Sequence, residues 1–223
     1  MKRKTIIIVA LIATILIADQ AFKIWVKTHF YLYEQVNVLG DWFRLNFVEN
    51  EGMAFGMVFF GGYWSKLILT LLRLAASSVI VWAIVQMIRK NVSWGLLICT
   101  ALVFAGAVGN IIDCIFYGKI FSQSVPFGFG EIATLFPDAG GYAACMQGKV
   151  VDMLQFDLFT IHFPSWIPYW GGTEMNFFPA IFNIADSSIT IGLFTALIFY
   201  WKKLSQFLSA YKFGKTQPQN TEQ

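Results

Sequence analysis

Four stretches of the chain are almost continuously apolar, and connections richer in polar and aromatic residues separate them. Each stretch has about 20 residues, which lets a helix cross a hydrocarbon core about 30 Å thick. Buried strands are usually much shorter than this. The pattern therefore predicts four transmembrane helices, at about residues 5–26, 67–88, 94–117 and 180–201.

The first long connection has a different period. Apolar and polar residues alternate from Phe43 to Val48, which is typical of a half-buried strand, and turn-forming residues flank this segment on both sides. We therefore expect a small β-sheet at about residues 30–60, on the membrane surface.

The second long connection falls into two parts. Residues 118–148 show no clear period and predict an irregular inserted loop, whereas residues 156–178 are dense in aromatics, as interfacial segments are. The polar tail at 211–223 predicts disorder. The fold class expected is thus an all-α membrane bundle of four helices, forming one domain over residues 1–210, with an outer sheet and an interfacial aromatic loop.

Composition and charge support this interpretation. The chain is 57% hydrophobic and only 13% charged, which excludes an ordinary soluble domain. Lys and Arg gather at both termini and in the short connection at 89–90, while the long connections carry more acids. Both termini are therefore predicted to be cytoplasmic. The net charge of +3 is then a topological signal, and no nucleic-acid partner is expected.

Three of the apolar stretches carry a polar pair at a spacing of three or four residues, which places both members on one helix face. With the predicted orientation, all three pairs lie toward the outer face, and Asp152 returns to that level from the second long connection. Ionisable groups in a membrane are costly and usually mark a functional site. The pairs are Asp19 with Lys23, Asn110 with Asp113, and Asn183 with Asp186.

Two carboxylates close together in a poorly solvated place cannot both ionise easily, so one keeps its proton. Such a pair can polarise a carbonyl and activate a water. Asp152 and Asp186 are the better candidates, because neither has a cation near it in sequence, whereas Asp19 and Asp113 could be structural. With only two histidines and no zinc-type spacing, no metal is expected. A proton- or ion-coupled carrier and a non-enzymatic scaffold remain open alternatives.

Five motifs follow one another in order over nearly the whole chain, and together they resemble the lipoprotein signal peptidase family, also called signal peptidase II. They are Asp19-Gln20-x-x-Lys23, Asn50-x-Gly52-x-Ala54-Phe55, Gly106-Ala107-Val108-Gly109-Asn110-x-x-Asp113, Val150-Val151-Asp152 and Pro179-Ala180-x-Phe182-Asn183-x-Ala185-Asp186.

The resemblance implies a four-helix aspartyl endopeptidase of the cytoplasmic membrane that needs no cofactor. It would act at the outer leaflet as a monomer among membrane lipids, and would remove signal peptides from precursors that carry a diacylglyceryl cysteine. Asp152 and Asp186 would be the catalytic pair. The residues implied to shape the site or position substrate are Asp19, Lys23, Asn50, Gly52, Asn110, Asp113 and Asn183.

Two departures from the family pattern concern the same region. Cys114 stands where family members usually have Arg, and the connection from Cys114 to Lys149 is longer than usual. Cys114 and Cys145 both fall on the predicted outer side, where disulfides can persist. They could therefore be bonded, with two separate thiols as the alternative.

Overall fold

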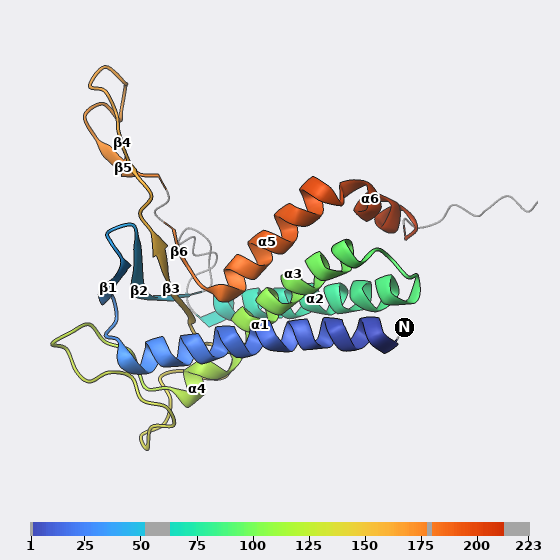
Figure 1. Cartoon of the computed structure of the whole chain (residues 1–223). Helices are drawn as coiled ribbons and strands as arrows, with labels where there is room; N and C mark the ends of the chain where they lie inside the picture. Colours follow the sequence, from blue (N-terminus) through green and yellow to red (C-terminus); the bar gives the residue numbers. More distant parts are fainter. Residues whose placement is uncertain (1, 52–62, 178–179, 212–223) are drawn as a thin grey trace, which may run out of the picture.

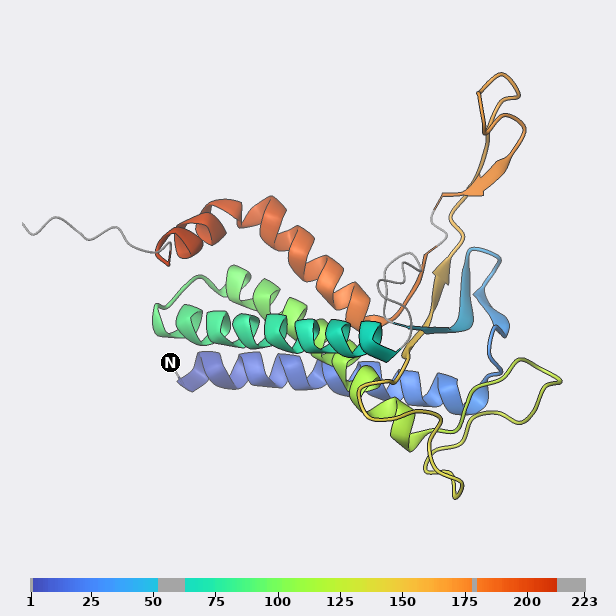
Figure 2. The ribbon, with the colours of Figure 1, turned by 180° about the vertical axis from the view of Figure 1, so that it is seen from behind.

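The computed structural model describes residues 2–51, 63–177 and 180–211. The long helices lie side by side in a bundle, and a β-sheet lies at one end of this bundle (Figures 1 and 2). The helix α3 is central, in contact with three other helices. The long helices are α1 (Lys2–His29), α2 (Tyr63–Arg89), α3 (Trp94–Ile112) and α5 (Ile184–Phe199).

Three helical segments are long and apolar enough to cross a membrane, namely Lys2–His29, Trp64–Arg89 and Trp94–Ile120. The predicted fourth helix differs from expectation, because α5 begins at Ile184 and a bend of 89° separates it from α6 (Trp201–Ser209). The described residues thus contain three candidate spans, or four if the bent pair counts as one, and the protein is a multi-pass membrane protein.

Small residues let α3 and α5 approach closely. A Cβ atom at Gly106 would lie 2.2 Å from the carbonyl oxygen of Ala185, and one at Gly109 would lie 2.8 Å from a carboxylate oxygen of Asp19. Real side chains do not tolerate contacts this short, so only glycine fits. This close crossing brings the polar residues at the sheet end of α3 against α1 and α5.

The predicted strand at Phe43–Val48 is confirmed, but the sheet is larger than the segment 30–60. Its four antiparallel strands are ordered β1-β2-β3-β6. Two of them come from the second long connection, and β6 occupies positions where the helix was expected to begin. The strands are β1 (Gln35–Leu39), β2 (Phe43–Asn50), β3 (Val150–Phe156) and β6 (Ile181–Phe182).

The end of α3 continues as a π-helix, η2 (Asp113–Tyr117), and one short turn, α4 (Gly118–Ile120). Apart from a bridge between Phe121 and Leu135, the inserted segment that follows is irregular, and it returns to this end of the helix. Gly148 N–H donates to the Cys114 carbonyl at 2.8 Å, and Met146 N–H donates to the Ile115 carbonyl at 3.2 Å. Backbone hydrogen bonds thus tie the segment to η2.

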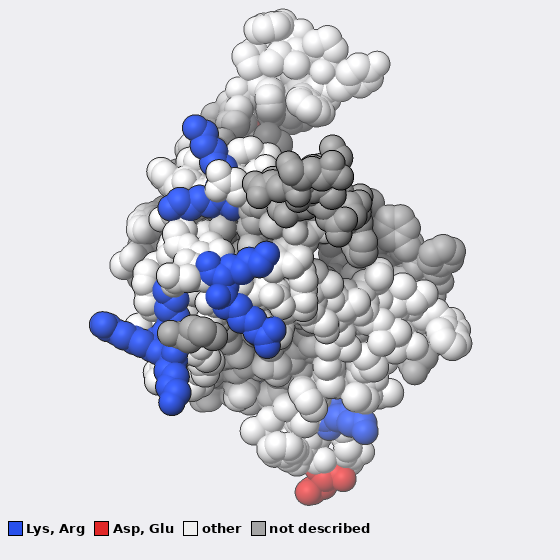
Figure 3. Space-filling model, turned by 90° about the vertical axis from the view of Figure 1, so that its right-hand side faces the viewer, with Lys and Arg blue, Asp and Glu red and all other residues white. Residues whose placement is uncertain are grey.

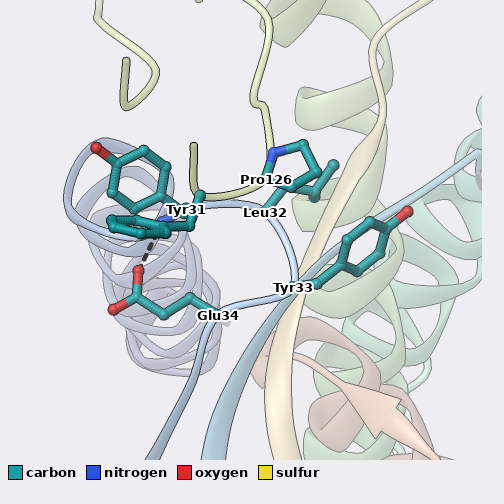
Figure 4. Close-up of a pocket in the computed structure, with 6 residues that line it drawn as sticks. Tyr31, Leu32, Tyr33, Glu34 and Pro126 are labelled. Atoms are coloured by element: carbon teal, nitrogen blue, oxygen red, sulfur yellow. Dashed lines mark hydrogen bonds between the residues drawn. The ribbon is translucent and has the colours of Figure 1, made fainter. Parts of the chain in front are cut away.

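The inserted segment also packs against the start of β1. Leu32 N–H donates to the Val125 carbonyl at 3.0 Å, and a pocket lies between the two segments (Figure 4). Within it, Tyr31 N–H donates to the Glu34 carboxylate at 2.8 Å. Among the described residues, none of the predicted site residues lines this pocket.

The aromatic segment after β3 forms a separate hairpin of β4 (Thr160–His162) and β5 (Glu174–Asn176). It projects from the sheet end, sideways to the long helices (Figure 1). The predicted disordered tail falls almost entirely at 212–223, outside the described residues.

Candidate active site

Asp152 lies in β3, with Val48 of β2 opposite it and only 4% of its surface exposed. Asn183 donates to one carboxylate oxygen at 2.7 Å, and Asn50 donates to the other at 3.3 Å. Burial raises the pKa of Asp152 to about 7, with the nearby charge of Asp186 as the second cause. Asp152 therefore holds a proton far more readily than an ordinary aspartate.

Asp186 is in the first turn of α5. Asn183 caps this helix, since its side-chain oxygen accepts a hydrogen bond from Asp186 N–H at 2.8 Å. The cap fixes the backbone turn that presents the Asp186 carboxylate, to which Asn110 donates at 2.7 Å. Asn183 thus joins the two acids, because its amide also binds Asp152.

Three other predicted residues form a buried ionic cluster beside this pair. The Lys23 ammonium lies 2.9 Å from a carboxylate oxygen of Asp19 and 2.8 Å from one of Asp113. Lys23 also donates to the side-chain oxygen of Asn110 at 2.9 Å. Asn110 therefore connects the ionic cluster to Asp186.

The ionic cluster holds two further elements in position. Val151 N–H, next to Asp152 in β3, donates to Asp113 at 3.2 Å. Ala185 N–H, next to Asp186 in α5, donates to Asp19 at 2.9 Å. Each carboxylate of the ionic cluster thus accepts a hydrogen bond from the backbone next to Asp152 or Asp186.

Gln20 completes the ionic cluster and was not among the predicted site residues. Its side-chain amide donates to Asp19, Asp113 and the Gly109 carbonyl, and its oxygen accepts from the Tyr117 hydroxyl at 3.0 Å. The available signal was its position beside Asp19 inside an apolar run.

A second buried cation, Lys27, was also missed. It is ion-paired with Glu49 of β2 and donates to Ser124 of the inserted segment at 2.7 Å. Its ammonium lies 5.0 Å from the centre of the Tyr142 ring. Lys27 follows Lys23 by four residues, so helical spacing placed it on the same face.

The cysteines are free thiols in the structure, and Cys114 and Cys145 are not bonded to each other. Cys114 is buried and accepts a hydrogen bond from the Arg73 guanidinium at 3.2 Å, whereas Cys145 is exposed. Backbone hydrogen bonds to η2 provide the attachment that a bridge would have given. Gly52, the remaining predicted residue, lies outside the described residues.

Together, Asp152 and Asp186 form a partly buried acid pair, to which the side-chain amides of Asn50, Asn110 and Asn183 donate hydrogen bonds. These amides orient the carboxylates, while burial and the nearby charge of Asp186 favour the protonated form of Asp152. An arrangement of one protonated and one ionised carboxylate can activate water and polarise a carbonyl.

Comparisons with known proteins agree with this architecture. Proteins called lipoprotein signal peptidase from Porphyromonas gingivalis and Amoebophilus asiaticus are 45% and 36% identical to the chain, each over 96% of it and over 90% and 84% of their own lengths. A solved structure described as a bacterial membrane enzyme superposes with a TM-score of 0.55 at 22% identity, covering 94% of both chains, which supports the fold. The family described as signal peptidase (SPase) II matches residues 11–202. The chain belongs to the signal peptidase II family.

Proposed function

We propose that this peptidase is an aspartic endopeptidase that removes signal peptides from prolipoproteins, with Asp152 and Asp186 as its catalytic pair. The observation that carries the mechanism is the amide-held pair itself, in which the pKa of Asp152 is raised to about 7 by burial and by Asp186. Family membership supports the substrate class, since the chain is similar over most of its length to proteins called lipoprotein signal peptidase.

In this mechanism Asp152 begins protonated and Asp186 begins ionised. Asp186 removes a proton from a water held between the two carboxyl groups, and that water attacks the scissile carbonyl carbon. Asp152 donates its proton to the carbonyl oxygen, which neutralises the charge that develops there. When the carbon–nitrogen bond breaks, Asp186 gives its proton to the leaving amine and Asp152 takes the proton of one hydroxyl group, so that the new carboxyl group forms and both acids return to their starting states. Asn50, Asn110 and Asn183 keep the carboxylates oriented throughout.

The proposed topology has four spans, with α5 and α6 as one bent span, and with both termini in the cytoplasm. Figure 3 shows the face opposite the sheet, where Lys and Arg spread over the helix ends and a single acidic patch lies at the edge. Cytoplasmic ends of membrane helices carry such an excess of basic residues. The sheet and acid pair then lie at the outer leaflet of the cytoplasmic membrane, within one domain over residues 1–210.

The proposed substrate is a precursor whose cysteine carries a diacylglyceryl group, bound by a monomeric enzyme from within the bilayer. Acyl chains that stay in the membrane bring the scissile bond to the level of the acids. Each buried methylene contributes about 0.8 kcal/mol, so two chains dominate binding.

The test is cleavage of two matched precursor peptides by the purified protein in proteoliposomes. The peptides share one sequence and differ only in the diacylglyceryl group. Efficient cleavage of the lipidated peptide alone is the expected result, whereas equal rates would refute lipid recognition. Solute flux without cleavage would indicate a carrier, and neither activity would indicate a scaffold.

A further inference from the structure

The hairpin between the two catalytic segments ends in an uncharged aromatic tip. No Asp, Glu, Lys or Arg occurs in residues 163–173, and the polar pair His162 and Glu174 lies just below the tip, with side chains 3.0 Å apart. At the tip itself Tyr169 is 100% exposed and Trp166 is 79% exposed. Large aromatic side chains are thus presented to the surroundings, beyond a polar base.

This exposure follows from a fixed backbone. Phe163 N–H donates to the Thr173 carbonyl and Gly172 N–H donates to the Phe163 carbonyl, each at 2.9 Å. A further bond at 2.9 Å joins Gly171 N–H to the Ile167 carbonyl, and Gly172 adopts a φ of +76° that favours glycine. These bonds fix the turn from which Trp166 and Tyr169 project, whereas Phe163 and Trp170 pack together below it with ring centroids 5.6 Å apart.

The direction of the hairpin decides what surrounds its tip. In Figure 1 it leaves the sheet sideways to the long helices, on the side of α5, and stays near the level of the sheet. Seen along the helices, the same lobe extends past the outline of the bundle and shows no basic or acidic atoms on this face (Figure 3). A lateral extension at the ends of membrane-spanning helices lies over lipid.

A second exposed aromatic segment supplies an internal contrast. Phe129 of the inserted segment is 81% exposed, and part of this segment extends past the end of α1 along the helix direction (Figures 1 and 2), where Val125 and Phe127 contact Leu32 and Tyr31. An extension in that direction leaves the membrane for water. Exposure is similar at Tyr169 and Phe129, while the directions differ.

We propose that the tip of the β4–β5 hairpin, residues 163–173, inserts into the boundary between headgroups and acyl chains of the leaflet at the sheet end. Trp and Tyr favour this depth because their rings are apolar and their N–H and O–H groups still reach polar partners. The polar base formed by His162 and Glu174 stays at the headgroups. The hairpin thereby anchors β3 and β6, which flank it in sequence, to the leaflet.

The test measures the depth of single spin labels in nanodiscs that hold one copy of the protein. Labels are placed with Tyr169→Cys and, as the matched control, Phe129→Cys, in a Cys145→Ser background, because Cys99 and Cys114 are buried. We expect collisions with oxygen relative to a water-soluble nickel chelate to be several-fold more frequent at 169 than at 129. Trp166→Cys provides a second tip label if the first variant folds poorly.

Equal access of the nickel chelate to both labels would overturn the proposal. Protection of residue 169 that persists in lipid-free amphipol would also overturn it, because protein rather than lipid would then cover the tip. So would protection that appears only after addition of a precursor peptide. None of these measurements requires cleavage, so their outcome is independent of the proposed peptidase mechanism.

Discussion

Asp113 and Asp152 are both almost completely buried near Val151, yet their surroundings differ in one respect. Asp113 lies against the Lys23 ammonium and also accepts from Gln20 and Val151 N–H. Asp152 accepts from the amides of Asn183 and Asn50 and faces the charge of Asp186. Asp113 thus contacts a cation directly, whereas the amides of Asn183 and Asn50 contact Asp152.

The contrast supports a positioning role for Asp113 and a chemical role for Asp152 in the proposed mechanism. The bond from Val151 N–H to Asp113 fixes the backbone of β3, and the bond from Ala185 N–H to Asp19 fixes the backbone of α5. A buried carboxylate beside another acid exchanges its proton near neutral pH, which acid–base catalysis requires. Asn110 accepts a hydrogen bond from Lys23 of the ionic cluster and donates one to Asp186, so the cluster also positions Asp186.

The largest expected effect is a loss of cleavage when either acid of the pair is replaced. Asp152→Asn and Asp186→Asn each remove an ionisable group at nearly constant shape, and we expect each to reduce cleavage of a lipidated precursor by about a thousandfold or more. Thermal unfolding should show that both variants fold. Asp157→Asn, which removes an acid paired with Arg44 farther along the same segment, is the control and should stay active. Near-normal turnover in either test variant would contradict the assignment.

Removing the cation of the ionic cluster should lower the free energy of unfolding. Lys23→Met leaves Asp19 and Asp113 buried without their cation, at an expected cost of about 3–5 kcal/mol in the free energy of unfolding. Lys119→Met, which removes an exposed cation, should change little. Adding Asp19→Asn and Asp113→Asn to Lys23→Met should restore part of the loss, measured by thermal unfolding in detergent. No recovery in the triple variant would argue against charge as the cause.

The close crossing of α3 and α5 should matter to a smaller extent. Gly106→Ala places a methyl group 2.2 Å from the Ala185 carbonyl oxygen, which pushes α5 away and loosens the bond from Asn110 to Asp186. Overpacking of this kind costs about 1–3 kcal/mol. We expect lower cleavage together with a lower unfolding temperature. Unchanged values for both would show that the crossing has room that the structure does not indicate.

The smallest effect concerns pH. Because the proposed mechanism requires a protonated Asp152 and its pKa is about 7, kcat/KM should fall as the pH rises through about 7. The ordinary pKa of an aspartate is 3.8, so the unfolded chain loses this proton at a lower pH than the folded protein does. The free energy of unfolding should therefore fall as the pH rises from about 4 to about 7.

A substitution of Asn50 tests whether Asp152 causes this pH dependence, because the hydrogen bond from Asn50 favours the ionised form of Asp152 and lowers its pKa. Asn50→Ala should therefore move the alkaline limb of the kcat/KM profile to higher pH. Asn46→Ala removes an amide that donates to Gln155 in the same sheet, and should leave the limb in place. A shift to lower pH in Asn50→Ala would be inconsistent with Asp152 as the proton donor.

Much of this architecture could be predicted from local patterns. Apolar runs located three spanning helices, alternation located β2, and helical spacing paired Asp19 with Lys23. The sequence could not decide whether Cys114 and Cys145 are bonded, because it carries no information on the distance between two thiols far apart in the chain. In the structure both are free.

The sequence by itself determined the membrane class, the family and the acids worth testing, because periodicity and polar residues in apolar runs are local properties of a chain. Only the tertiary structure decided that β3 and β6 join the sheet, that Asn183 both caps α5 and binds Asp152, and that Gln20 and Lys27 belong to the polar interior. These features depend on pairings between segments up to about a hundred residues apart. Their geometry is set when α3 packs against α1 and α5, and no local pattern specifies that packing.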